Sequence, residues 1–347
     1  MTSNQRKLAL ALTVVAATLA ACGQKEEEKV ADAAPVADAT CGAVTIASMN
    51  WQSAEVLASI DQFILANGYG CDAELVPGDT MPTLTAMMEK GQPDVAPEAW
   101  VNSIRQPLEA AVAEGRLHFG AESLSDGGVE GWWIPKYLAD ANPDIKTIDD
   151  ALMRPELFPA PEDDTKGAVH NCPAGWSCQI TTGNAFKAWD AEEKGFTLVD
   201  TGSSAGLDGS IAKAYERKQG WLGYYWAPTS ILGKYDMVRL DPGVPLDQAA
   251  WDSCNTKLDC ADPQKSAWPK ADVFTVVTDR FKQEGGEAYN YLANRQWDNN
   301  TVNGLLAWMS DNQATGEDGA AHFLKTNEAM WTTWVSPAAA EKIKAAL

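Results

Sequence analysis

Short apolar runs alternate with helical patterns from Cys41 onward, and this alternation restricts the possible folds more than any other feature of the sequence. Apolar residues recur every three or four positions in the helical stretches and follow one another directly in the strand-like ones. Strands are predicted at 44–47, 73–76 and 94–96, and helices at 53–66 and 79–88. This order predicts the beginning of an open parallel α/β sheet.

The same pattern returns in the second half of the chain. Extended segments are predicted at 131–135, 196–199, 221–226 and 274–278, and a helix at 207–217 that Ser203 or Ser204 begins. We expect the last strand to return to the first sheet, so that the chain forms two α/β lobes and crosses between them. Ligands of open α/β sheets bind in the crevice at the carboxyl ends of the strands.

Residues 1–21 have the pattern of a lipoprotein signal peptide. Basic residues precede an apolar stretch at 8–17, which is shorter than the roughly 20 residues that span a bilayer. Leu19-Ala-Ala leads directly into Cys22, which indicates lipidation of Cys22, although small residues also suit an ordinary secretory signal. Residues 22–40 are charged and lack apolar periodicity, as in a flexible tether. We therefore expect a periplasmic protein of the cell envelope that a lipid anchors to a membrane.

The cysteine count agrees with export. Lipidation of Cys22 leaves six of the seven cysteines, and this even number suggests disulfides in an oxidising compartment. Several pairings are possible, and proximity along the chain favours Cys172–Cys178 and Cys254–Cys260, which leaves Cys41–Cys71. A metal site is the alternative, but the cysteine spacing does not match zinc motifs and the three histidines are scattered. No metal or cofactor is predicted.

The chain contains 14 tryptophans, more than a core of this size needs, because Trp is rarely fully buried and is costly to expose. Several stand at predicted strand ends or in the cysteine loop, beside Pro or Gly: Trp51, Trp100, Trp176 and Trp226. Packing is the simpler explanation for others: Trp189, Trp251, Trp268, Trp297, Trp308, Trp331 and Trp334.

Several indole faces around one point form a cage for an alkylated cation, because the ring quadrupoles attract positive charge. The methyl groups of such a cation lose no hydrogen bonds on burial. Three dry rings supply about 6 kcal/mol, at about 2 kcal/mol each. Micromolar capture needs about 8 kcal/mol, so a cage together with a clamp on a carboxylate is sufficient.

Three segments occur in an order typical of one family. The first runs from Asp79 to Asp94-Val-Ala-Pro-Glu-Ala-Trp100, the second is the loop Asn171-Cys-Pro-Ala-Gly-Trp-Ser-Cys178, and the third runs from Gly202-Ser-Ser-Ala-Gly to Tyr224-Tyr-Trp-Ala-Pro228. They resemble the glycine betaine and choline receptors of ABC importers, the ProX/OpuAC-like substrate-binding proteins. The resemblance implies the two-lobed periplasmic binding protein fold (type II), with lobe 1 at 41–133 and 272–347 and lobe 2 at 134–271.

The resemblance also implies which residues bind the ligand. It gives an aromatic box of Trp100, Trp176 and Trp226, and it assigns a ligand carboxylate to the backbone N–H groups of Ser177 and Cys178.

Other positions make the composition of the box less regular. Trp51 stands where choline-type relatives carry a box Trp, and Trp133 lies at the predicted lobe crossing. The family's histidine four residues after the first box Trp is Ile104 here, and a second Trp common in the third segment is Ser230. Polar candidates for the other end of the ligand are Ser53, Asn102 and Gln179.

The predicted function is capture of a quaternary ammonium osmolyte such as glycine betaine, for osmoprotection. Lobe closure over the ligand would precede delivery to an ABC permease with a separate ATPase, since no Walker motif is present here. A net charge of −21 without a basic patch argues against nucleic acid as a partner.

Other functions remain open at this point. The ligand could be choline, dimethylsulfoniopropionate, a sugar or a metal. The enzyme alternative is a serine hydrolase, because Gly202-Ser-Ser-Ala-Gly206 fits a nucleophile elbow around Ser204. The only later histidine is His322, which fits a helix surface better, and a serine-capped helix start is the simpler explanation.

Overall fold

The computed structural model describes residues 41–347. The predicted signal peptide, Cys22 and the predicted tether lie outside the described residues. No helix between residues 41 and 347 is both long and apolar enough to cross a membrane.

The first sheet has five strands in the order β2-β1-β3-β10-β4. Their bounds are β1 Ala43–Met49, β2 Asp72–Gly78, β3 Val95–Trp100, β4 Leu117–Glu122 and β10 Val273–Thr278. β1 pairs in parallel with β2 and β3, as the strand–helix alternation predicts, whereas β10 runs antiparallel between β3 and β4. The strand predicted at 274–278 therefore does return to the first sheet.

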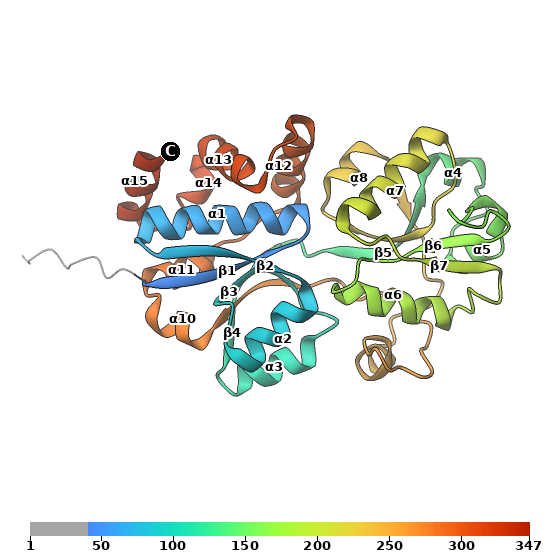
Figure 1. Cartoon of the computed structure of the whole chain (residues 1–347), viewed down its shortest axis with the longest axis horizontal. Helices are drawn as coiled ribbons and strands as arrows, with labels where there is room; N and C mark the ends of the chain where they lie inside the picture. The colour runs from blue at the N-terminus through green and yellow to red at the C-terminus, as the bar shows by residue number, and fades with distance from the viewer. Residues whose placement is uncertain (1–40) are drawn as a thin grey trace, which may run out of the picture. The chain divides into compact units, whose positions relative to one another are not determined.

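Helices cover both faces of this sheet, with α1, α13 and α15 on one side and α2 and α3 on the other (Figure 1). Their bounds are α1 Gln52–Tyr69, α2 Thr80–Lys90, α3 Arg105–Ala113, α10 Asp279–Glu284, α11 Glu287–Asn294, α12 Asn299–Asn312, α13 Gly316–Thr326, α14 Glu328–Trp331 and α15 Pro337–Ala346.

The helix predicted at 53–66 extends further than expected, so its predicted end is wrong. The helix continues to Tyr69 and stops at Gly70, which adopts the left-handed conformation with φ 67°. Gly68 lies inside the helix and allows α15 to pack closely against it, because a Cβ on Gly68 would lie 3.0 Å from Cδ1 of Ile343.

The second sheet also has five strands, in the order β7-β6-β8-β5-β9. Their bounds are β5 Val129–Pro135, β6 Gly167–His170, β7 Phe196–Val199, β8 Gly223–Ala227 and β9 Met237–Arg239. β6 pairs in parallel with β7 and β8, and β5 runs antiparallel to β8 and β9. The flanking elements are α4 Lys136–Ala141, α5 Ile148–Leu152, η1 Pro155–Leu157, α6 Ser177–Ala188, α7 Ser204–Arg217, α8 Ser230–Lys234, α9 Gln248–Ala250 and η2 Trp251–Asn255.

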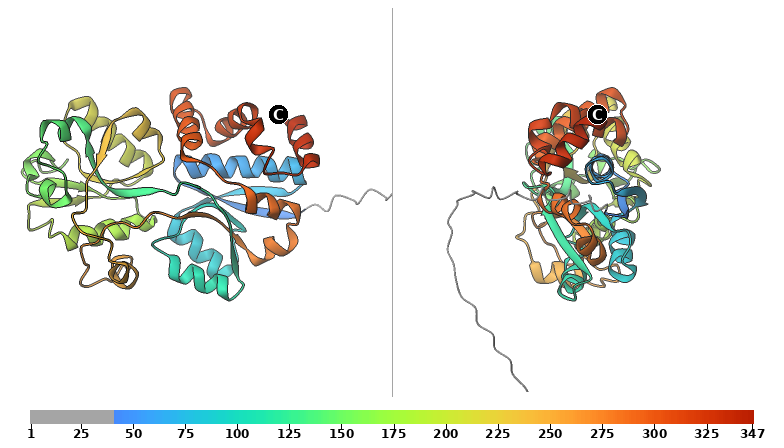
Figure 2. Two further views of the ribbon diagram at one scale, coloured as in Figure 1. Left: turned by 180° about the vertical axis from the view of Figure 1, so that it is seen from behind. Right: turned by 90° about the vertical axis from the view of Figure 1, so that its left-hand side faces the viewer.

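The chain passes between the sheets twice, from β4 to β5 and again before β10 (Figure 2). All of β5 pairs within the second sheet, so the lobe boundary predicted after Trp133 falls inside a strand. Gly128 and Ala271 pair where the chain crosses between the sheets. The N–H of Gly128 donates to the carbonyl of Ala271 at 2.8 Å, and the N–H of Ala271 donates to the carbonyl of Gly128 at 3.2 Å.

Three disulfides are present, Cys41–Cys71, Cys172–Cys178 and Cys254–Cys260, and they are the three pairings favoured by the sequence. The first ties the start of β1 to the start of β2, and the other two close small loops.

Candidate functional site

Four indoles come from separate places in the chain to one region. Trp51 follows β1 and directly precedes α1, Trp100 ends β3, Trp176 directly precedes α6, and Trp226 lies in β8. Trp51 and Trp100 thus belong to segments of the first sheet, and the other two belong to segments of the second. Strand ends and helix starts place these side chains at sheet edges, where ligands of α/β proteins bind.

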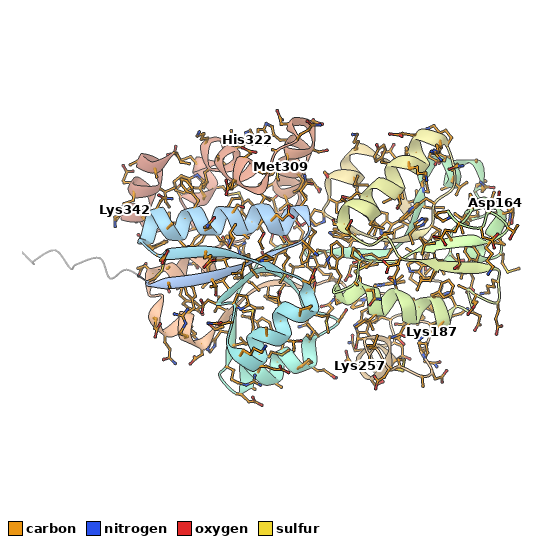
Figure 3. The ribbon with its side chains drawn as sticks, in the orientation of Figure 1. Asp164, Lys187, Lys257, Met309, His322 and Lys342 are labelled. Atoms are coloured by element: carbon orange, nitrogen blue, oxygen red, sulfur yellow. A yellow bond between two sulfur atoms is a disulfide. The ribbon has the colours of Figure 1, made fainter. Side chains whose placement is uncertain are left out.

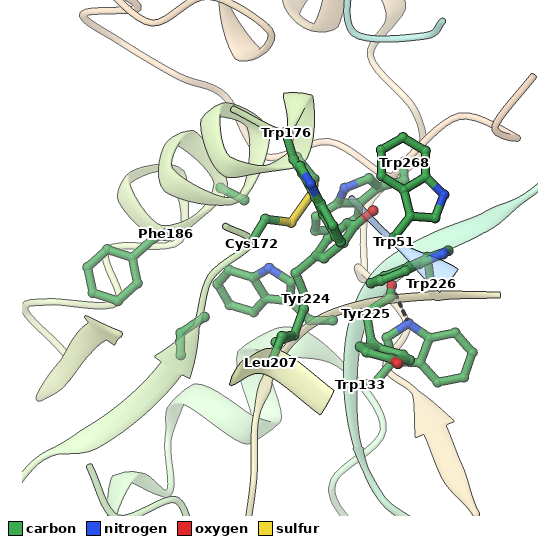
Figure 4. Close-up of a cluster of buried hydrophobic side chains, with 14 of the residues drawn as sticks. Trp51, Trp133, Cys172, Trp176, Phe186, Leu207, Tyr224, Tyr225, Trp226 and Trp268 are labelled. Carbon is green, nitrogen blue, oxygen red and sulfur yellow. Dashed lines mark hydrogen bonds between the residues drawn. A yellow bond between two sulfur atoms is a disulfide. The ribbon is translucent and has the colours of Figure 1, made fainter. Parts of the chain in front are cut away.

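The indole of Trp176 contacts the indoles of both Trp51 and Trp226 (Figure 4). Trp176 stands between the other two, with ring centroids 5.4 Å from Trp51 and 5.1 Å from Trp226, and it meets both edge-on at 75° and 84°. All three rings border one shared space.

This space is a small pocket walled mainly by aromatic side chains. A compact ligand therefore fits it best. The lining residues are Trp51, Thr80, Trp100, Glu130, Trp176, Ser177, Cys178, Tyr224 and Trp226.

The N-terminus of α6 forms one part of the pocket wall, through Ser177 and Cys178. The first N–H groups of a helix have no partner within the helix and carry partial positive charge, so they bind anions well. The disulfide from Cys178 to Cys172 ties this helix start to the end of β6. The pocket thus has an electropositive end that is covalently fixed.

An acidic side chain, Glu130 of β5, lines the same pocket. The hydroxyl of Tyr224 donates to Oε1 of Glu130 at 2.7 Å, and Nη1 of Arg239 donates to its backbone carbonyl at 3.2 Å. Burial raises the pKa of Glu130 to about 7, while the hydrogen bond from Tyr224 acts in the opposite direction. This carboxyl group can therefore carry a negative charge inside an aromatic pocket near neutral pH.

A second acidic residue, Glu98 of β3, lies behind two of the indoles and is fully buried. Its Oε1 accepts hydrogen bonds from Nε1 of Trp51 at 2.8 Å and from Nε1 of Trp100 at 2.9 Å. Oγ of Ser53 donates to the same oxygen at 2.9 Å. Burial raises the pKa of Glu98, and these three hydrogen bonds lower it.

Sequence reasoning missed Glu98, Glu130 and Tyr224. The available signal was an acidic residue inside an otherwise apolar strand, in Val95-Ala-Pro-Glu-Ala-Trp100 and in Val129-Glu-Gly-Trp-Trp-Ile134. Buried carboxylates are rare unless they are paired, so such positions are candidates for a site.

Several contacts join segments of the two sheets around the pocket. Nε1 of Trp176 donates to Oδ1 of Asn50 at 2.5 Å, and the N–H of Met81 donates to the carbonyl of Gly175 at 3.0 Å. Oγ of Ser230 donates to Oε1 of Gln52 at 2.8 Å. Ser230, which replaces a Trp common in the predicted family, thus contributes a bridging hydrogen bond.

The structure places some of the predicted candidates away from the pocket lining. Trp133 is buried and donates from Nε1 to the carbonyl of Tyr225 at 2.9 Å, so its polar group is used within the second sheet (Figure 4). Oγ of Ser53 donates to Glu98, and Nδ2 of Asn102 donates to the carbonyl of Lys270; neither residue lines the pocket. Gln179 lines a different hollow on the second lobe, beside Asn171.

The serine hydrolase alternative lacks its catalytic geometry. The hydroxyl of Ser203 accepts from the N–H of Gly206 at 3.0 Å, so this glycine-serine segment caps the start of α7. His322 lies on α13 among the C-terminal helices, where its ring stacks on Trp308 with centroids 3.7 Å apart (Figure 3). Within residues 41–347 no hydrogen bond joins Ser204 to a histidine.

Two α/β sheets with a small aromatic pocket between their segments define a two-lobed solute-binding protein. The chain belongs to the family of substrate-binding domains of ABC-type glycine betaine transport systems, whose family model matches residues 42–326. This confirms the family indicated by the three sequence segments.

Solved structures of similar proteins share the fold. The glycine betaine/L-proline-binding protein ProX from Borrelia burgdorferi is 18% identical, with a TM-score of 0.68 over 87% of this chain and 99% of that chain. Lactococcal OpuAC in its closed form with glycine betaine is 18% identical, with a TM-score of 0.64 over 85% and 100%. An ABC-transporter choline-binding protein in complex with choline is 18% identical, with a TM-score of 0.68 over 88% and 98%. The predicted two-lobed type II periplasmic binding protein fold is confirmed.

Proposed function

We propose that this chain captures a quaternary ammonium osmolyte, glycine betaine or a related betaine, in the aromatic pocket and delivers it to an ABC permease. One observation carries the proposal. Four indoles, a carboxyl group and the N-terminus of α6 line the same small pocket.

The two ends of that space suit the two ends of a betaine. The trimethylammonium group would lie among Trp51, Trp100, Trp176 and Trp226, each dry ring contributing about 2 kcal/mol. Its carboxylate would accept hydrogen bonds from the first N–H groups of α6, the charge-assisted type of hydrogen bond. The predicted roles of Ser177 and Cys178 are part of this proposal.

The carboxyl group of Glu130 favours a second candidate, choline. Choline has a net positive charge and a hydroxyl group that can donate to Glu130, whereas a betaine brings its own carboxylate into the pocket. Among the solved relatives, one holds glycine betaine and another holds choline, so both ligand types fit this fold. Dimethylsulfoniopropionate, with a methylated sulfonium and a carboxylate, remains a third ligand of the same kind.

The proposal includes lobe closure. Lobe 1 would comprise 41–127 and 272–347, lobe 2 would comprise the rest of the described chain, and the bridging hydrogen bonds of Trp176 and Ser230 would stabilise the closed form. We further propose a periplasmic receptor that a lipid on Cys22 anchors to a membrane and that performs no catalysis itself.

Calorimetric titration with glycine betaine, choline, proline betaine, dimethylsulfoniopropionate and a sugar panel tests the proposal. We expect micromolar or tighter binding of at least one methylated cation, equivalent to about 8 kcal/mol or more, and no binding of sugars. Binding of a sugar in place of every methylated cation would contradict the proposed function.

A further inference from the structure

Three hydrogen-bond donors converge on a single oxygen of Glu98. Two of them are the indole N–H groups of Trp51 and Trp100, and the third is the hydroxyl of Ser53. Glu98 does not line the pocket, so it can influence a ligand only through the two indoles or through its electric field.

A buried ion pair holds the strand that carries Glu98. Nε of Arg295 lies 2.9 Å from Oδ1 of Asp61, and both side chains are fully buried. Nη2 of Arg295 donates to the carbonyl of Pro97 at 3.1 Å and to Oγ1 of Thr275 at 2.8 Å. Arg295 therefore holds Pro97, the residue before Glu98, and this restricts the movement of the Glu98 carboxyl group.

The hydrogen-bond pattern favours the ionised form of Glu98. Its Oε1 already accepts three hydrogen bonds, and its Oε2 is buried with no hydrogen-bond partner within residues 41–347. A proton on Oε2 would therefore have no acceptor, whereas charge on the carboxylate strengthens all three existing bonds. Burial raises the pKa of Glu98 overall, and the three hydrogen bonds together with the guanidinium of Arg295 oppose that rise.

We propose that Glu98 is a positioning residue that sets the cation selectivity of the pocket through the indoles of Trp51 and Trp100. This inference rests on the proposed function and deepens it. The carboxylate fixes the orientation of both rings. It also polarises them, because a negative acceptor at the indole N–H increases the electron density of the ring face that meets the ligand.

The effect of Glu98 on binding should depend on the charge of the bound group and not on its shape. A trimethylammonium group gains from electron-rich ring faces and from the nearby negative charge. A tert-butyl group of the same size gains only the apolar contact. Removal of the charge from Glu98 should therefore weaken binding of the cation and leave binding of the neutral group nearly unchanged.

Glu98→Gln provides the test, because glutamine keeps the shape and an acceptor oxygen while it removes the charge. Wild type and variant are titrated by calorimetry with the tightest-binding quaternary ammonium ligand and with its tert-butyl analogue, in which carbon replaces the quaternary nitrogen. We expect the ratio of the two affinities to fall roughly tenfold, about 1.4 kcal/mol. Glu109→Gln, which removes an exposed carboxylate on α3, is the matched control and should leave the ratio unchanged.

Equal weakening of both ligands in Glu98→Gln would overturn the inference, because it would show that Glu98 only maintains the structure. Wild-type protein that binds neither ligand would refute the proposed function itself, which separates the two failures. If Glu98→Gln does not fold, Trp51→Phe and Trp100→Phe each remove one link to the carboxylate and keep a ring. Each should lower the same ratio, and an unchanged ratio in both would overturn the inference.

Discussion

Trp176 is the ring on which the pocket depends most, because within residues 41–347 it is the one of the four that contacts two others, Trp51 and Trp226. Replacement by Ala removes one dry ring, which costs about 2 kcal/mol of binding energy. It also removes the hydrogen bond to Asn50 that joins the two lobes, about 1 kcal/mol more. Together these losses predict a rise in Kd of about a hundredfold, since each 1.4 kcal/mol is about tenfold.

The assay is calorimetric titration of Trp176→Ala with the tightest-binding ligand of the wild type. A buried Trp contributes to stability, so circular dichroism and a melting curve must first show that the variant is folded. Trp308→Ala is the matched control, because Trp308 stacks on His322 among the C-terminal helices and should not affect Kd. A folded Trp176→Ala protein with the Kd of the wild type would refute the reasoning.

Three further predictions follow from the site. A Cβ on Gly128 would lie 2.2 Å from the ring of Trp100, so Gly128→Ala should displace that indole. We expect Kd, measured by calorimetry, to rise at least about tenfold. An unchanged Kd would show that binding does not need this ring. Reduction of Cys172–Cys178 frees a loop whose closure is worth roughly 2 kcal/mol, so folded, reduced protein should bind roughly tenfold more weakly, and identical titrations with and without reductant would contradict this. Burial raises the pKa of Glu130 to about 7, so this carboxyl group is ionised above about pH 7 and neutral below it. Affinity for a methylated cation should therefore be higher above about pH 7 than below it. If Glu130→Gln shows the same pH profile as the wild type, Glu130 is not the group responsible.

The part of the fold that sequence patterns predict is the part with local causes. Strand and helix alternation reveals β1, α1, β2, α2 and β3, because apolar spacing is a property of each segment alone. The pairing of β10 between β3 and β4 depends on segments more than 150 residues apart, and the short strand β4 lacks a clear apolar run.

The site divides in the same way. Trp51, Trp100, Trp176 and Trp226 are visible in the sequence because they stand at strand ends and in a closed loop, where a core Trp is unusual. Trp133 lies instead inside a predicted extended segment, where pairing of β5 with β8 accompanies a hydrogen bond from its indole N–H to the carbonyl of Tyr225.

The two carboxyl groups depend on contacts between distant segments. Glu98 receives hydrogen bonds from Trp51 and Ser53, which lie 47 and 45 residues earlier. Glu130 is bonded by Tyr224, 94 residues later in the chain. Periodicity cannot reveal such partners, because only the completed sheets bring them together.

A crystal structure of the protein with glycine betaine tests the central claim most directly. We expect the quaternary nitrogen within about 6 Å of the ring centroids of Trp51, Trp100, Trp176 and Trp226. The carboxylate should lie at the N-terminus of α6. A ligand bound outside this pocket, or one whose methyl groups face away from the indoles, would contradict the account.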